Sequence, residues 1–172
     1  MNKYNNHQHV SLSQKAQHAL STDISQRRKI EACGVLLGSI DDLGNWLVED
    51  LCPLRNIFNS PVYFEFDPED LLNIELSYPD KVVGVYHSHP TGFAQASDTD
   101  RRNMQHVNAE ERIPWVWLII CGPFPQKQSQ QQIPGTKILA YHHFDTDGLQ
   151  EIELHLAEPT SDIQPEEFQH EI

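Results

Sequence analysis

The chain has 172 residues, which is enough for one domain with its own hydrophobic core. Hydrophobic residues make up 38% and aromatic residues 9%, a globular composition that argues against a disordered protein. The formal charge of −13 at pH 7 argues against binding to nucleic acid, because a phosphate backbone requires clustered Lys and Arg. The same charge permits attraction to a basic partner.

Three features bear on the location of the protein. The longest apolar run, 115–121, is too short to cross a bilayer, which takes roughly 20 residues. The N-terminal stretch MNKYNNHQHV lacks the apolar core of a signal peptide. The three cysteines, Cys33, Cys52 and Cys121, lie far apart without a CxxC spacing, so no disulfide framework is expected. We therefore expect a cytoplasmic protein in a reducing compartment, without a membrane partner.

The first half of the chain predicts a helix, a hairpin, a third strand and a second helix. The first helix has apolar residues at helical spacing, and the hairpin strands flank an Asp-Asp-Leu-Gly turn signal. The third strand, VYFEFD, alternates apolar and polar residues, and the second helix begins with an aspartate before a proline. In chain order these elements are expected at roughly 12–24, 33–39, 45–54, 62–67 and 68–77.

The second half predicts a strand, a helix, an apolar strand, a Gln-rich loop and a last hairpin. These are expected at 81–89, 97–111, 115–122, 123–135, 136–144 and 149–156. Three helices mixed with strands indicate the α+β class. We divide the chain into a flexible N-terminus, one domain and an acidic, disordered tail, at 1–9, 10–156 and 157–172.

The stretch GVYHSHPTGFAQASDTD places two histidines at the end of a predicted strand. Side chains alternate along a strand, so His87 and His89 are expected on one face, together with Val83 and Val85. Two imidazoles at this spacing can reach one ion, and Asp100, at the start of the next helix, is the candidate third ligand. Two histidines and a carboxylate with an open fourth position are typical of a catalytic zinc rather than a structural one.

The same residues also have a purely structural interpretation. Ser97 and Asp100 form a helix-capping pattern, in which the serine accepts a backbone N–H and the aspartate occupies the favourable first turn. Two histidines at a strand end can also be solvated. The capping role and the ligand role are compatible, because the start of a helix is a rigid place for a ligand.

Glu31, in the stretch IEACGVLLG, is the candidate proton carrier. A metal hydrolase needs a group that takes a proton from the attacking water and gives one to the leaving nitrogen, and a glutamate near the metal can do both. From the residues alone, a solvated carboxylate before an apolar strand is the simpler interpretation. Cys33, two residues further on, is expected as a buried core residue rather than a nucleophile.

Taken together, Glu31, His87-Ser88-His89-Pro90 and Ser97-Asp98-Thr99-Asp100 resemble the signature of the JAMM (MPN-plus) zinc metalloproteases, in their bacterial branch. The resemblance covers roughly 10–145 and rests on a glutamate, HxHP and SxxD in the same order and spacing. Ala96 departs from the family, because many members have a proline there. The resemblance implies the MPN, cytidine-deaminase-like fold, in which a curved, mainly antiparallel sheet packs between helices.

The resemblance also implies a role for each site residue. His87, His89 and Asp100 would bind one zinc ion per chain, Glu31 would act as general base and acid, and Ser97 would stabilise the oxyanion. The implied reaction is cleavage of the peptide or isopeptide bond after the Gly-Gly tail of a ubiquitin-like or sulfur-carrier protein. E1- or E2-like proteins of the same operon would be further partners, and VYFEFD is the candidate edge strand for the substrate tail.

Other functions remain open at this stage. One is the release of an amino acid such as cysteine from a sulfur-carrier protein, and another is an MPN-type binding scaffold without activity. DNA-repair-type RadC proteins share the HxHPxG and SxxD pattern but lack the EACG-type strand. Cytidine deaminases are excluded because HxE and PCxxC are missing, and ordinary zincins because HExxH is missing.

Overall fold

The structure is a computed structural model and describes residues 7–126 and 137–160. Most of the N-terminus 1–9, the Gln-rich loop 123–135 and the tail 157–172 lies outside the described residues, so the division into these parts stays a prediction. The elements, in chain order, are β1 (His9–Leu12), α1 (Gln14–Gln26), β2 (Cys33–Ile40), β3 (Trp46–Leu54), α2 (Pro68–Ser77), β4 (Val82–His89), α3 (Asp98–Gln105), the π-helical turn η1 (His106–Glu110), β5 (Val116–Cys121), β6 (Lys137–Phe144), β7 (Gly148–Glu151) and β8 (Glu153–Leu156).

The strands form one mixed sheet in the order β7-β6-β5-β4-β2-β3-β1-β8. β1 pairs in parallel with β3 and β8, β4 pairs in parallel with β5, and the other four pairs are antiparallel. The sheet is strongly curved, because β7 and β8 are consecutive in the chain yet lie at opposite ends of the strand order. Between them, the N–H of Ile152 donates to the carbonyl of Ala140 in β6 at 2.7 Å. The predicted α+β class and curved sheet are confirmed.

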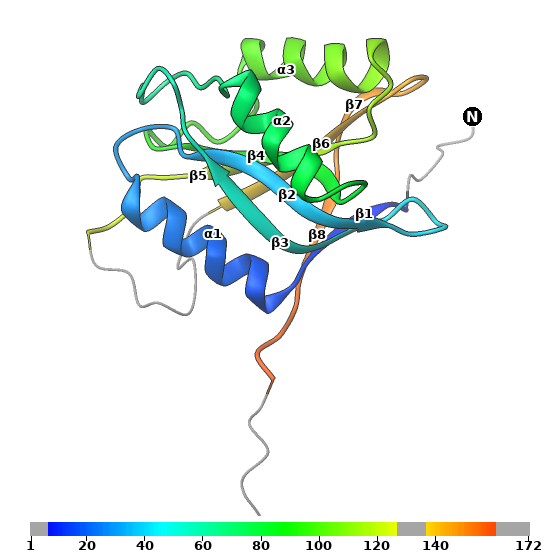
Figure 1. The fold of residues 1–172 in the computed structure, drawn as a ribbon, viewed down its shortest axis with the longest axis horizontal. Helices are drawn as coiled ribbons and strands as arrows, with labels where there is room; N and C mark the ends of the chain where they lie inside the picture. Colours follow the sequence, from blue (N-terminus) through cyan, green and yellow to red (C-terminus); the bar gives the residue numbers. More distant parts are fainter. Residues whose placement is uncertain (1–6, 127–136, 161–172) are drawn as a thin grey trace, which may run out of the picture.

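Helices cover both faces of this sheet, with α1 on one side and α2 and α3 on the other (Figure 1). In α1, Ala16, Leu20 and Ile24 are fully buried at helical spacing and pack into the larger core cluster. Met104 of α3 is fully buried in a second cluster, and α2 contributes half-buried Leu71 to a third. No helix in the described ranges is long and apolar enough to cross a membrane.

Most of the predicted elements are confirmed. The hairpin is β2 and β3, which pair antiparallel across the predicted turn. The second helix begins at Pro68 and ends at Ser77, with Asp67 as its N-cap. The predicted helix 97–111 corresponds to α3 followed by η1.

Three element predictions are wrong in part. VYFEFD forms no strand, because no neighbouring strand pairs with it, and it runs as a loop from β3 to α2. Leu12 belongs to β1 rather than to the first helix, which begins at Gln14 after Ser13 accepts the Ala16 N–H at 3.0 Å. The expected strand 149–156 is two strands, of which only β7 pairs with β6 as predicted, while β8 pairs with β1.

A register shift in β4 places Val83 on the opposite face from the one predicted. Gly84 pairs with Leu36 and Val82 with Leu37, so the pairing with β2 skips Val83. Val83 packs into the core cluster that contains α1, whereas Val85 packs into the cluster that contains α3. The predicted alternation therefore holds from Val85 to the carboxyl end of the strand and fails before it.

Candidate metal-binding active site

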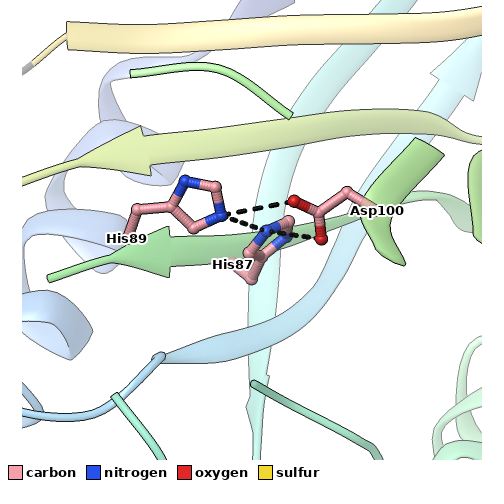
Figure 2. Close-up of side chains that lie close together, drawn as sticks. All are labelled: His87, His89 and Asp100. Atoms are coloured by element: carbon pink, nitrogen blue, oxygen red, sulfur yellow. Dashed lines mark hydrogen bonds and ion pairs between the residues drawn. The ribbon is translucent and has the colours of Figure 1, made fainter. Parts of the chain in front are cut away.

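The two histidines lie at the carboxyl end of β4, in the middle of the sheet, between β2 and β5. His87 is 1% exposed and His89 is also buried. The helix α3 begins beside them, and Asp100 in its first turn is buried as well. Figure 2 shows both imidazole rings turned toward the Asp100 carboxylate. The alternative that these histidines are solvated at a strand end is therefore wrong.

The polar atoms of this cluster converge on one point. Nε2 of His87 lies 3.2 Å from one carboxylate oxygen of Asp100, and Nε2 of His89 lies 3.3 Å from the other. The two Nε2 atoms are 3.1 Å apart. Within the described part of the chain, these three residues form the one group of His, Cys, Asp or Glu side chains whose ligand atoms could share a metal ion.

The fit to a metal can be judged from the donors themselves. Nδ1 of His89 lies 2.8 Å from the carbonyl oxygen of Phe93, an acceptor, so Nδ1 donates its hydrogen there and Nε2 is the nitrogen that faces Asp100 and could bind a metal once unprotonated. At Zn–N distances of 2.0–2.1 Å, two ligands on a tetrahedral zinc lie about 3.3 Å apart. The observed separations of 3.1–3.3 Å match this spacing. The residues present thus fit a metal ion of this kind.

The charge of the cluster centres on an ionised Asp100. Burial lowers the pKa of His87, which keeps its imidazole neutral. Burial alone would raise the pKa of Asp100, but hydrogen bonds with His87 and His89 outweigh it and hold that pKa far below its usual range. Burial also acts to lower the pKa of His89, but its contacts with Asp100 and Phe93 raise it overall. A carboxylate and two imidazoles are thus held together in a buried place.

Ser97 and Asp100 form the predicted capping box. The N–H of Asp100 donates to Oγ of Ser97 at 3.1 Å, and the N–H of Ser97 donates to the Asp100 carboxylate at 2.7 Å. The same carboxylate faces the two histidines. The capping interpretation and the ligand geometry are therefore both present, and the cap orients the carboxylate toward the imidazoles.

Glu31 lies at the edge of the cluster. Its carboxylate is 4.0 Å from Nε2 of His89, and the residue is 5% exposed. Burial raises the pKa of Glu31 to about 7, against the effect of His89, which lowers it. The simpler interpretation of a solvated carboxylate is wrong for this residue.

Several residues around the site were not singled out from the sequence. Ser88, between the histidines, accepts the N–H of Ala32 at 2.9 Å and so ties β4 to the segment that carries Glu31. The ring of Phe64 stacks on His87 with centroids 4.5 Å apart. Nδ1 of His87 has no hydrogen-bond partner within the described residues. The contacts of Ser88 and Phe64 leave no signal in the sequence, because each joins segments that are distant in the chain.

Cys33 is fully buried, and burial raises the pKa of its thiol to about 12. The prediction of a core residue rather than a nucleophile is confirmed. All three cysteines are free.

A second buried polar cluster lies on the α1 side of β4. Asp23 receives two hydrogen bonds of 2.7 Å from Arg27 and one of 2.6 Å from the hydroxyl of Tyr86. The Arg27 guanidinium also donates to the carbonyl oxygens of Leu54 and Cys33, at 2.7 and 2.8 Å. The spacing of Asp23 and Arg27, four residues apart on a helix, is the one sequence signal for this cluster.

Comparison with known proteins decides the family. Residues 13–133 match the family described as prokaryotic homologs of the JAB domain. This chain belongs to that family. The resemblance to the JAMM metalloproteases is thereby confirmed, while the roles of the individual site residues stay predictions.

Two curated relatives of this JAB-family protein are named desampylase. The one from Pyrococcus furiosus is 35% identical over 94 residues, which cover 53% of this chain and 59% of the relative. The one from Haloferax volcanii is 36% identical over 99 residues, which cover 54% of this chain and 63% of the relative. The chain thus spans about three fifths of the length of these relatives.

A solved structure supports the fold. The solution structure of a Desulfitobacterium hafniense protein superposes with a TM-score of 0.66 at 26% identity. The match covers 87% of this chain and 94% of that chain. The architecture is therefore shared over nearly the whole described domain.

Proposed function

We propose that this JAB-family protein is a zinc-dependent hydrolase that cleaves the peptide or isopeptide bond after the C-terminal Gly-Gly tail of a ubiquitin-like or sulfur-carrier protein. The observation that carries the proposal is the convergence of His87, His89 and Asp100 at one buried point, with the Glu31 carboxylate beside it. The two relatives named desampylase support a deconjugating activity.

The three ligands would hold one zinc ion per chain, with a fourth position open to the reactants. A zinc ion bound there would supply Lewis acidity for the hydrolysis of an amide. Glu31 takes the proton of the attacking water and later gives it to the leaving nitrogen. Burial raises the pKa of Glu31, which suits this double role because it makes the carboxylate easier to protonate.

The Ser97 hydroxyl would donate to the oxyanion. Its Oγ accepts one hydrogen bond, from the N–H of Asp100, which leaves the hydroxyl hydrogen for another acceptor. The residue is half-buried at the start of α3. A fixed donor of this kind is typically worth about 10²–10³ in rate.

The segment VYFEFD, expected as an edge strand for the substrate tail, is a loop without strand pairing. The carbonyls of Tyr63 and Glu65 accept hydrogen bonds from Asn56 and Ile57 within the loop. A Gly-Gly tail can approach closely because glycine has no side chain to collide with the ring of Phe64 or with the metal site.

Two further expectations rest on composition and on the family resemblance. Interaction with E1- or E2-like proteins stays a prediction, and so does the cytoplasmic location. The charge of −13 favours a partner with a basic face, whose binding would weaken as salt is raised.

A cleavage assay tests the proposal. A ubiquitin-like or sulfur-carrier protein that ends in Gly-Gly is fused to a reporter and incubated with the enzyme. Cleavage is expected after the second glycine, and it should stop with a chelator and fall about 10²–10⁴-fold in Glu31→Gln. A fusion in which a bulky residue replaces the final glycine should resist cleavage. Cleavage that survives the chelator would refute the proposed chemistry, and equal cleavage of the bulky variant would refute the proposed specificity.

A further inference from the structure

The position of Glu31 is not set by the sheet. β2 begins at Cys33, so Glu31 lies in the link between α1 and β2 and has no ladder partner. Its neighbours are held by Ser88, which accepts the N–H of Ala32 through Oγ and donates its own N–H to the carbonyl of Ala32 at 2.8 Å. The main-chain groups of Glu31 itself must be satisfied elsewhere, because they are buried.

Both of these groups are bound by the turn at 56–60. The N–H of Glu31 donates to the carbonyl of Ser60 at 2.8 Å, and its carbonyl accepts from Nδ2 of Asn56 at 3.1 Å. Asn56 is 1% exposed. Its side-chain amide also donates to the carbonyl of Tyr63 at 2.9 Å, and its Oδ1 accepts the N–H of Phe58 at 3.1 Å. One buried amide thus fixes the turn and binds the backbone of Glu31.

We propose that Asn56 is a positioning residue for Glu31, an inference that rests on the proposed role of Glu31 as general base. Of the side chains in the described residues, Asn56 is the one with a recorded hydrogen bond to the main chain of Glu31. Its loss leaves a buried carbonyl without a partner and frees the link to move. Displacement of a proton carrier by about 1 Å can cost about 10²-fold in rate.

The variants are chosen to separate positioning from folding. Asn56→Asp keeps the size and the acceptor but loses both donors to the carbonyls of Glu31 and Tyr63. Asn59→Asp makes the same change three residues further along the turn, on an exposed residue, and is the matched control. Val10→Ala opens a buried site in β1, far from β4 in the sheet, and is the control for lost stability.

With the Gly-Gly fusion as substrate, Asn56→Asp is expected to lower kcat about 10- to 100-fold, with KM changed less than about 3-fold and zinc content unchanged. Asn59→Asp and Val10→Ala should keep kcat within about 2-fold of wild type, when assayed well below their melting temperatures. In the Glu31→Gln background, Asn56→Asp should lower the residual rate by much less than it does in wild type, because both changes act through one group. A kcat for Asn56→Asp no lower than that for Val10→Ala would overturn the inference.

A second measurement does not depend on activity. Amide hydrogen exchange of Glu31, followed by NMR, should be at least about 10-fold faster in Asn56→Asp than in Asn59→Asp, because the turn that binds this amide is released. Unchanged exchange would overturn the inference even if kcat falls. Full activity in Glu31→Gln would instead refute the role of Glu31, and with it the inference, whereas an inactive Glu31→Gln with a fully active Asn56→Asp would refute the inference alone.

Discussion

Two buried polar clusters lie on opposite faces of β4 and differ in how their groups are paired. Tyr86 and His87 are neighbours in the chain, and their side chains point to opposite sides of the sheet. On the α1 side, the Asp23 carboxylate is matched by the Arg27 guanidinium and the Tyr86 hydroxyl. On the other side, the Asp100 carboxylate faces Nε2 of both His87 and His89, and the three groups could share one metal ion.

The difference separates a cluster that stabilises the fold from one that could hold a metal ion. In the first, donors and acceptors match, a charge faces its counter-charge, and burial raises the pKa of Tyr86 so that its hydroxyl stays a donor. In the second, Nε2 of both imidazoles and the Asp100 carboxylate converge on one point, where a shared proton or a metal ion can lie. A buried cluster whose ligand atoms converge on one point therefore marks the candidate functional side of the strand.

The largest effect is expected from removing a ligand. Asp100→Ala leaves two imidazoles, so zinc affinity should fall more than about 100-fold and hydrolysis should cease. Metal analysis after dialysis is the measurement. Asp98→Ala, an exposed aspartate in the same turn of α3, should keep its metal. Full zinc occupancy in Asp100→Ala would remove the distinction between the two clusters.

The converse change tests the other cluster. Asp23→Ala leaves the buried Tyr86 hydroxyl without its acceptor and the half-buried Arg27 without its counter-charge, so the free energy of unfolding should fall by about 3 kcal/mol. Zinc content should remain that of wild type, because no zinc ligand is touched. Denaturant unfolding together with metal analysis checks both statements. A stable variant that has lost its zinc would show that the two clusters are one unit.

The sequence predicted one of these clusters far better than the other. His87, His89 and Asp100 lie within one short stretch, where the period of a strand and a helix-capping pattern give their positions directly. Asp23 and Arg27 have helical spacing, but nothing near them in the sequence indicates Tyr86. The contact between Asp23 and Tyr86 depends on how α1 packs on the sheet.

Elsewhere, the sequence patterns failed where an element depends on pairing with a distant part of the chain. VYFEFD alternates like a strand, yet strand formation needs a neighbour, and none pairs with it. In the described residues, β1 pairs with β3 and β8, and β8 pairs with β1, so their register depends on strands that are distant in the chain and local composition gave no sign of it. Asn56 carries no motif at all, since its role arises from a contact with Glu31 across 25 positions.

A smaller effect is expected from the charge of Glu31 on the metal-free protein. Burial raises its pKa from 4.5 to about 7, so the fold favours the protonated form. The stability that this group contributes is present below pH 4.5 and is lost as the pH rises through about 7. Glu31→Gln should therefore stabilise the metal-free protein relative to wild type, by on the order of 2 kcal/mol at pH 8 and far less at pH 5. Glu49→Gln, on an exposed residue of β3, is the control, and a gain for Glu31→Gln that does not depend on pH would contradict the prediction.

The smallest change in stability is expected where capping and chemistry share one residue. Ser97→Ala removes the N-cap of α3 and should cost about 1 kcal/mol, whereas Ser97→Asn keeps a capping side chain and should cost less. Both variants lose the hydroxyl, so both should turn over more slowly than wild type while they retain zinc. Thermal unfolding, metal analysis and the fusion assay together separate the two roles. If Ser97→Asn restored both stability and rate, the hydroxyl would have no part in catalysis, and Ser97 would act only by holding Asp100 in place.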